Sequence, residues 1–156
     1  MITLVEGEKF VEPGVLVDCE LELILIEQYP GNPNLNFAPA YRFKMVNSYD
    51  GREFGRIDLR IGNTYDLRMY SGHVGYRVYE AHRGHRFAAR AVRLVLPLAR
   101  QHQLDILWIT CNPDNHASRR SCELAGLKFI EIVDLPHDND MYLRGERQKC
   151  RYRLIL

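Results

Sequence analysis

Short runs of apolar and polar residues in alternation recur along the chain and predict β-strands. These runs cover 15–29, 40–47, 52–61, 72–79 and 148–156. The second and third runs are joined through Asp50-Gly51, which is a strong hairpin signal, so an antiparallel meander is expected. A continuous apolar run at 105–110 predicts a strand covered on both faces, as in a parallel sheet. A further strand is expected at 127–133.

One long segment, 87–102, carries apolar residues at helical spacing. They are Phe87, Ala91, Leu94, Val95 and Leu98. Pro97 lies within this segment, and proline removes a helix hydrogen bond and clashes with the carbonyl four residues back. We therefore expect a kink near Arg93 or an early end of the helix.

A second helix is expected to start near Ala117, with Asn115 or Asp114 as its N-cap, and to end before Gly126. Strands that alternate with helices in this way indicate an α/β fold, and the strand–helix–strand unit around 87–102 implies a right-handed crossover.

The bulk composition is that of one globular domain over residues 1–156. The net charge is +1, which argues against nucleic acid as the main partner although several arginines cluster locally. The four cysteines contain no Cys-x-x-Cys pair, so neither a metal site nor a disulfide framework is expected. A cytoplasmic location is expected instead.

Residues 1–9 lack a basic region followed by an apolar run, which predicts no signal peptide. No apolar stretch approaches the roughly 20 residues that span a bilayer, so no membrane partner is expected.

A basic, glycine-containing turn, His82-Arg83-Gly84-His85-Arg86, leads from the strand at 72–79 into the long helix. The first N–H groups of a helix have no intrahelical partner, and the helix dipole adds about half a positive charge there. Such a turn is suited to bind the pyrophosphate of a nucleotide-bearing cofactor. An ordinary strand-to-helix turn with a solvated basic face is the alternative.

Two motifs in order resemble the GNAT superfamily of N-acetyltransferases. Arg83-Gly84-His85-Arg86-Phe87-Ala88 is similar to the family pattern Arg/Gln-x-x-Gly-x-Gly/Ala, with Arg86 at the position of the central glycine. Asn115-His116-Ala117-Ser118 resembles the Asn-x-x-Ser start of the family's later helix, and 125–129 resembles the element that follows. The resemblance covers roughly 52–134. It fails at 30–39, where the family has two helices and this segment has no room for them.

The resemblance implies a mixed, mostly antiparallel sheet with a central splayed parallel strand pair, flanked by helices. The strand at 76–79 would separate from the strand at 108–111, and the arm of acetyl-CoA would lie between them like an added strand. Pairing of the two strands throughout is the alternative. The implied cofactor-binding residues are Tyr76, Val78, Arg83, Gly84, His85, Arg86, Phe87, Ala88, Asn112, Asn115 and Ser118. For the last two, capping of the helix is the simpler explanation.

Candidate catalytic residues are His73, Glu80 and Cys122. His73 is the first choice for a base that removes a proton from an amine, because histidine titrates near neutrality, and Glu80 is the second. Cys122 stands where many relatives have a tyrosine that protonates the departing thiolate. A thiol is a weak donor, and a nucleophilic cysteine would need a lowered pKa, so core packing is the alternative for Cys122. His82 and His85 have no evident third partner for zinc, and no metal is expected.

The implied activity is transfer of an acetyl group from acetyl-CoA, as co-substrate, to an amine of a small molecule or protein by direct attack. A non-catalytic CoA-binding or interaction protein on the same scaffold is the alternative. Dimerisation stays open, with the terminal strand at 148–156 as an exposed edge that could pair or exchange between subunits.

Overall fold

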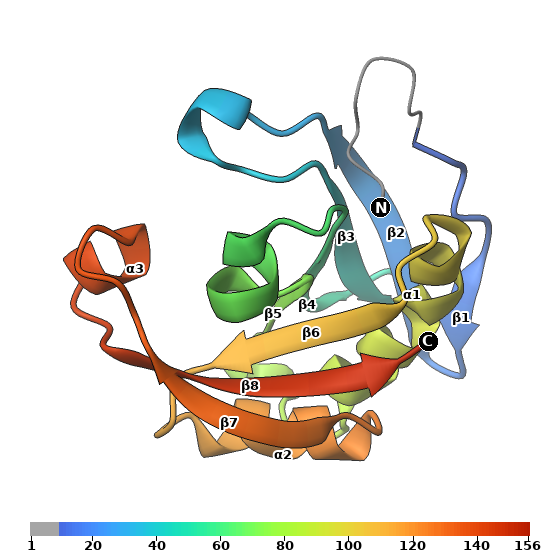
Figure 1. The fold of residues 1–156 in the computed structure, drawn as a ribbon. Helices are drawn as coiled ribbons and strands as arrows, with labels where there is room; N and C mark the ends of the chain where they lie inside the picture. Colours follow the sequence, from blue (N-terminus) through green and yellow to red (C-terminus); the bar gives the residue numbers. More distant parts are fainter. Residues whose placement is uncertain (1–9) are drawn as a thin grey trace.

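The computed structural model describes residues 10–156, so the predicted absence of a signal peptide at 1–9 lies outside the described residues. Its larger sheet has five strands in sequence order, all antiparallel to their neighbours (Figure 1). The strands are β1 (Leu16–Asp18), β2 (Leu21–Tyr29), β3 (Ala40–Asn47), β4 (Glu53–Arg60) and β5 (Val74–Val78). The predicted meander is confirmed.

The prediction of one strand over 15–29 is wrong, because the chain turns back at Cys19. This residue has a left-handed backbone with φ of 52°, and β1 and β2 form a hairpin around it. Between β2 and β3 there is only a 3₁₀ helix, Pro33–Leu35. The expected lack of room for two helices in this connection is confirmed.

The smaller sheet has three antiparallel strands in the order β6-β8-β7. They are β6 (Ile106–Cys111), β7 (Lys128–Asp134) and β8 (Gln148–Ile155). The terminal strand β8 lies in the middle of this sheet, so the expectation that it offers a free edge for pairing is wrong. A dimer itself stays a prediction.

Helix α1 (Phe87–Gln101) covers one face of the larger sheet and runs through Pro97, so the predicted early end is wrong. Pro97 and Arg93 are both exposed, which leaves the unpaired carbonyl of Arg93 on the solvent side. The buried side of α1 is formed by Phe87, Ala88, Ala89, Ala91, Val92, Val95, Leu98 and Ala99. These pack against inward-facing residues of β2, β3 and β4 such as Leu23, Phe43 and Ile57.

Helix α2 (His116–Leu124) lies against β6 and β7, at the bottom of Figure 1. The segments that were not predicted include a π-helical turn, Leu67–Ser71, between β4 and β5, and α3 (Asp140–Leu143) between β7 and β8. No helix within residues 10–156 is long and apolar enough to cross a membrane.

The two sheets meet where β5 begins. The N–H of His73 donates to the carbonyl of Trp108 at 2.7 Å, and Gly72 passes against the backbone of β6. Beyond this point no ladder joins β5 to β6 among the described residues, so the alternative that these strands pair throughout is wrong. The parallel orientation of the two strands stays a prediction.

Candidate functional site

The turn between β5 and α1 presents unused backbone donors. A 3₁₀ helix, Glu80–His82, is followed by Gly84 with φ of 96° and by Arg86, the N-cap of α1. No side chain caps α1, and no acidic residue lies in its first turn. The first N–H groups of a 15-residue helix therefore point out of the turn without a capping partner, which is the arrangement that binds an anion.

The backbone conformation of Arg86 explains why the motif that this segment resembles has a glycine at this position. Its backbone is left-handed, with φ of 60° and ψ of 27°, a conformation that glycine adopts without steric cost. An arginine here retains the turn and its backbone N–H, and adds a guanidinium group. Neither Arg83 nor Arg86 forms an ion pair with any residue of 10–156, so both leave their charge available at the helix start.

The cluster of arginines predicted at this turn divides into two kinds. Arg90 is used inside the protein: Nε lies 2.6 Å from Asp18 and Nη1 lies 2.5 Å from Glu20. It also donates to the carbonyl of His85, which ties the turn to the β1–β2 hairpin. Arg83 donates to the carbonyl of Val78 at 3.2 Å and is otherwise exposed.

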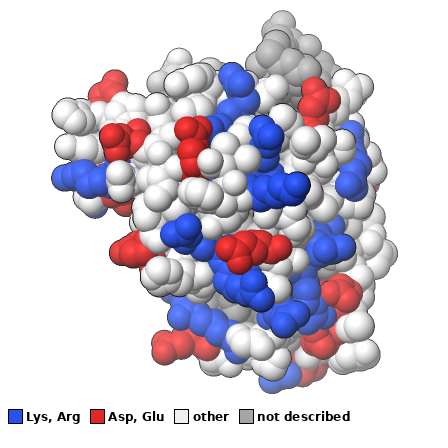
Figure 2. Space-filling model, turned by 60° about the horizontal axis from the view of Figure 1, so that its bottom comes forward, with Lys and Arg blue, Asp and Glu red and all other residues white. Residues whose placement is uncertain are grey.

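A hollow of about 370 Å³ opens beside the same turn, lined in part by His82, His85 and Phe87. The Phe87 ring stacks on Phe54 of β4 with the ring centres 4.3 Å apart. The face below α2 is mixed in charge: Figure 2 shows basic side chains in a broken band with acidic ones between them. Positive charge therefore does not dominate this face.

The middle of β5 contacts α2 through Tyr76. The Tyr76 hydroxyl lies 2.8 Å from Ser118 Oγ, 3.2 Å from the Ser118 carbonyl oxygen and 3.8 Å from Cys122 Sγ. Asn115 caps α2, because its Oδ1 accepts from the N–H of Ser118 at 3.1 Å. Tyr76, Ser118 and Cys122 are thereby brought together across more than 40 residues of sequence.

The three predicted catalytic residues are not brought together. His73 has no exposed surface, its Nδ1 accepts from the Trp108 N–H, and its Nε2 lies 3.0 Å from the Gly62 carbonyl. Burial lowers the pKa of His73 to about 4. Both ring nitrogens are occupied, so His73 joins the two sheets and has no nitrogen free to act as a base.

Glu80 is exposed in the turn after β5, and its side chain forms no hydrogen bond or ion pair with a described residue. It lies seven positions after His73 along mostly extended chain, a distance of about 20 Å. Cys122 is buried, and burial raises the pKa of its thiol to about 12. This favours the protonated thiol at neutral pH and agrees with the alternative of core packing.

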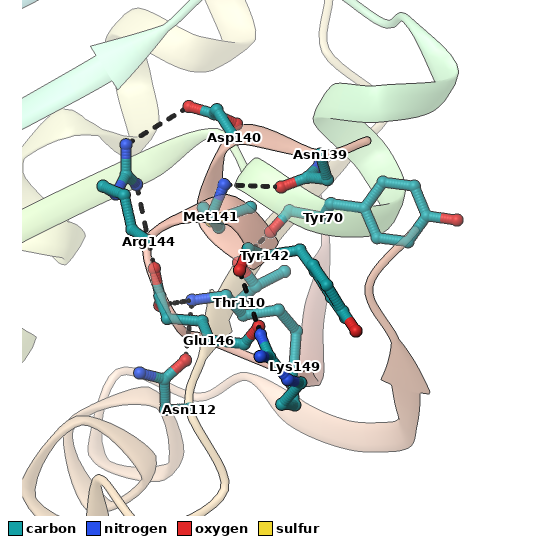
Figure 3. Close-up of polar contacts among 11 residues, drawn as sticks. Tyr70, Thr110, Asn112, Asn139, Asp140, Met141, Tyr142, Arg144, Glu146 and Lys149 are labelled. Carbon is teal, nitrogen blue, oxygen red and sulfur yellow. Dashed lines mark hydrogen bonds and ion pairs between the residues drawn. The ribbon is translucent and has the colours of Figure 1, made fainter. Parts of the chain in front are cut away.

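A buried lysine near the start of β8 was missed by the sequence reasoning (Figure 3). Lys149 Nζ donates to Asn112 Oδ1 at 2.8 Å and to Glu146 Oε1 at 2.7 Å. Burial opposes ionisation of Glu146, but the bond and charge of Lys149 hold the pKa of Glu146 below its usual value. Asn112, predicted to contact the cofactor, thus anchors the loop around α3. Only the inward register of Lys149 in β8 could have signalled this.

The connection between β4 and β5 contacts both β6 and the α3 loop. Thr110 Oγ1 of β6 donates to the carbonyl of Tyr70 at 2.7 Å (Figure 3). Asn139, whose Oδ1 caps α3 through the Met141 N–H, also donates from Nδ2 to Asp66 Oδ1 at 3.5 Å. These contacts join Leu67–Ser71 to β6 and the α3 loop to the β4–β5 connection.

Comparison with known proteins identifies a family and a fold. The model of the acetyltransferase (GNAT) domain matches residues 21–128. A solved structure from Vibrio cholerae, assigned as a ribosomal-protein-serine acetyltransferase, is similar over 94% of this chain and 100% of its own, with 16% identity and a TM-score of 0.66. No curated protein matches the chain.

Two further structures align over shorter stretches. A GNAT-family acetyltransferase from Bacillus anthracis shares 18% identity over 73% of this chain and 65% of its own, with a TM-score of 0.56. A spermidine N-acetyltransferase from Vibrio cholerae, in complex with CoA and spermine, shares 14% identity over 74% and 65%, with a TM-score of 0.55. At these identities the structures support the fold alone.

Proposed function

The chain belongs to the GNAT acetyltransferase family, and from this premise we propose that it transfers an acetyl group from acetyl-CoA to an amine of a small molecule or protein. The observation that carries the proposal is the uncapped start of α1 beside the unpaired edge of β5. The first supplies N–H donors and local positive charge for a pyrophosphate. The second supplies backbone groups for an extended arm that contains amides.

The proposed pyrophosphate site is the turn Arg83, Gly84, His85, Arg86, Phe87 and Ala88. Its backbone N–H groups bind the phosphate oxygens, and the guanidinium groups of Arg83 and Arg86 add charge. The arm then runs back along β5, past Val78 and Tyr76. Since the carbonyl of Val78 accepts from Arg83, this arginine must turn away from Val78 if the arm is to use the same carbonyl.

Ser118 is placed to face the arm from α2, because its hydroxyl reaches Tyr76 of β5. Asn112 and Asn115 support the site indirectly. Asn112 accepts a hydrogen bond from Lys149, and Asn115 caps α2. When bound, acetyl-CoA supplies the acetyl group as a thioester that an amine attacks. The chain then contributes mainly by holding both reactants in place, which can supply much of the rate.

The acceptor amine is proposed only as a class. Two of the similar structures are described as enzymes for a ribosomal protein and for spermidine, so the fold serves acceptors of both sizes. The acceptor would approach past the connections 30–39, between β2 and β3, and 135–147, between β7 and β8. We propose that the same domain extends over residues 1–156, and that the protein works in the cytoplasm, where its cysteines stay reduced.

A thermal melt with and without acetyl-CoA, combined with calorimetry, tests the proposal. Ligand at about 100 times its Kd stabilises by about 2.7 kcal/mol, which is a rise in Tm of about 5 to 10 °C at this size. Arg83→Glu should abolish the rise, whereas Arg93→Glu, an exposed arginine further along α1, should retain most of it. No shift and no heat in the unaltered protein would overturn the proposal.

The same sample separates an enzyme from a binding protein. An amine panel that includes polyamines and peptide N-termini is added with acetyl-CoA, and release of free thiol is followed. Thiol release with at least one amine supports a transferase. The alternative, a non-catalytic CoA-binding protein, is favoured by the lack of a free base in the described site, and it predicts binding without thiol release.

A further inference from the structure

The hydroxyl of Tyr76 lies between the hydrophobic core and a polar residue of α2. Tyr76 is half-buried on β5 and packs against the hydrophobic core, yet its ring extends to α2 and sets the hydroxyl beside Ser118 and Cys122. Its closest partner, Ser118 Oγ at 2.8 Å, is able to donate as well as accept. When Ser118 donates, the proton of Tyr76 is directed to the Ser118 carbonyl, at a longer 3.2 Å.

The position of Tyr76 along β5 matches the expected reach of the cofactor arm. The arm of CoA between phosphate and sulfur has a backbone about as long as four residues of extended chain. The proposed pyrophosphate site begins at Arg83, whose Nε lies 3.2 Å from the Val78 carbonyl, so the arm starts beside the end of β5. Laid back along the five residues of β5, an arm of this length places the sulfur along the strand that carries Tyr76, on the side where β5 has no ladder to β6.

Building on the proposed function, we propose that Tyr76 is a catalytic residue whose hydroxyl donates a hydrogen bond to the sulfur of CoA as the thioester breaks. Ser118 is its positioning residue, because its hydroxyl donates to the phenol oxygen and leaves the phenol proton only the longer bond to the Ser118 carbonyl, which it exchanges for the sulfur when CoA is bound. A donor aimed at an atom that gains negative charge stabilises the transition state more than the ground state.

The bonds and charges balance without another reactant. The amine nitrogen forms a bond to the carbonyl carbon, the carbon–sulfur bond breaks, and the sulfur leaves with the electron pair as a thiolate. The nitrogen releases one proton to solvent. Tyr76 retains its own proton throughout: burial raises the pKa of its phenol, so it acts as a hydrogen-bond donor and is not consumed as an acid.

Cys122 does not supply this donor. Its thiol is buried and 3.8 Å from the Tyr76 hydroxyl, and a thiol donates weakly. In this arrangement Cys122 forms part of the apolar wall behind the hydroxyl. That wall keeps water from competing for the phenol proton and strengthens its bond to a thiolate.

The test is Tyr76→Phe, which removes one oxygen and retains the ring, with Tyr79→Phe as the matched control. Tyr79 lies three residues further on, and its hydroxyl donates to Glu53. The first readout is the ionisation of the CoA thiol bound to each variant, followed by the ultraviolet absorbance of the thiolate across pH. Loss of a hydrogen bond to a charged group should lower the acid dissociation constant of the bound thiol about 10- to 100-fold in Tyr76→Phe, and leave it unchanged in Tyr79→Phe.

The second readout is turnover with the amine found in the acceptor screen. We expect kcat to fall about 10- to 100-fold in Tyr76→Phe, with the Kd of acetyl-CoA within about twofold of the unaltered protein. An unchanged thiol constant in Tyr76→Phe would overturn the proposal and leave Tyr76 as a packing residue. Failure of the unaltered protein to bind CoA would overturn the proposed function instead, and calorimetry before the titration separates the two results.

Discussion

His73 is the residue whose titration is most strongly changed by the fold. It is fully buried, both ring nitrogens lie on backbone partners, and its pKa falls to about 4 from an ordinary 6.5. The folded protein therefore retains a neutral imidazole, whereas the unfolded chain binds a proton below about pH 6.5. This contribution to stability is complete above pH 6.5 and is lost as the pH falls toward 4. It amounts to about 3 kcal/mol.

Urea unfolding at steps between pH 7 and 4.5 checks this prediction. The free energy of unfolding should decrease over that range, and His73→Gln should flatten the decrease even though it lowers stability at pH 7. A second measurement does not depend on the variant: the ring protons of His73, followed by NMR, should not titrate above about pH 5. Titration near pH 6.5 in the folded protein would contradict the burial of this ring.

At the scale of residues, the sequence predicted only part of the site. The turn at 83–88 was found because its residues are adjacent in sequence and follow a pattern. The meeting of Tyr76 with Ser118 spans 42 residues, and no local pattern encodes it. His73 was chosen as a base from its residue type alone, although its burial depends on Gly62 and Trp108, which are distant in sequence.

At the scale of elements, Arg90 holds the start of α1 against the β1–β2 hairpin. Its guanidinium contacts Asp18, Glu20 and the carbonyl of His85, and the hydrogen bond from Arg90 lowers the pKa of Asp18. Arg90→Ala should cost about 1 to 3 kcal/mol, since it removes hydrogen bonds between charged groups that are only partly exposed. Urea melts measure the cost, and hydrogen exchange should show faster exchange in the hairpin.

Arg93→Ala is the control, because Arg93 lies on the same helix, is exposed, and forms no ion pair within residues 10–156. Its effect should stay within about 0.5 kcal/mol. Equal effects of the two substitutions would mean that the contacts of Arg90 add nothing to the docking of α1.

The sequence predicted elements well where side-chain alternation and turn chemistry agree. The strand at 40–47 and its Asp-Gly hairpin are the clearest case, since inward residues such as Tyr41, Phe43 and Met45 alternate with Arg42 and Lys44. The break at Cys19 was missed because cysteine is not a typical turn residue and the apolar pattern continues across it. Leu67–Ser71 was missed because five residues are too few to display a helical period.

For the whole molecule, the joint between the two sheets depends on one glycine. Gly72 has φ of 73°, and a Cβ placed there would lie 3.1 Å from both the Thr110 nitrogen and the Trp108 oxygen, which are backbone atoms of β6. With ψ of 165°, Gly72 lies in a backbone region that is essentially restricted to glycine, so Gly72→Ala combines strain of about 1 to 3 kcal/mol with crowding of about 1 to 3 kcal/mol more. It should also loosen the adjacent bond from His73 to Trp108, which hydrogen exchange at the His73 amide would detect.

Gly51→Ala is a comparison without crowding. Gly51 also has a positive φ, 78°, but a Cβ added there would meet no atom within 4 Å, so this substitution introduces backbone strain without a clash. A larger loss of unfolding free energy in Gly72→Ala, measured by urea melts of both variants, is expected from its clash with β6 and its more restricted backbone. Equal losses would show that β6 moves aside at little cost in free energy, and that the contact between the two sheets at Gly72 is easily deformed. In that case the unpaired edge of β5 would not be held in place for a cofactor arm before binding.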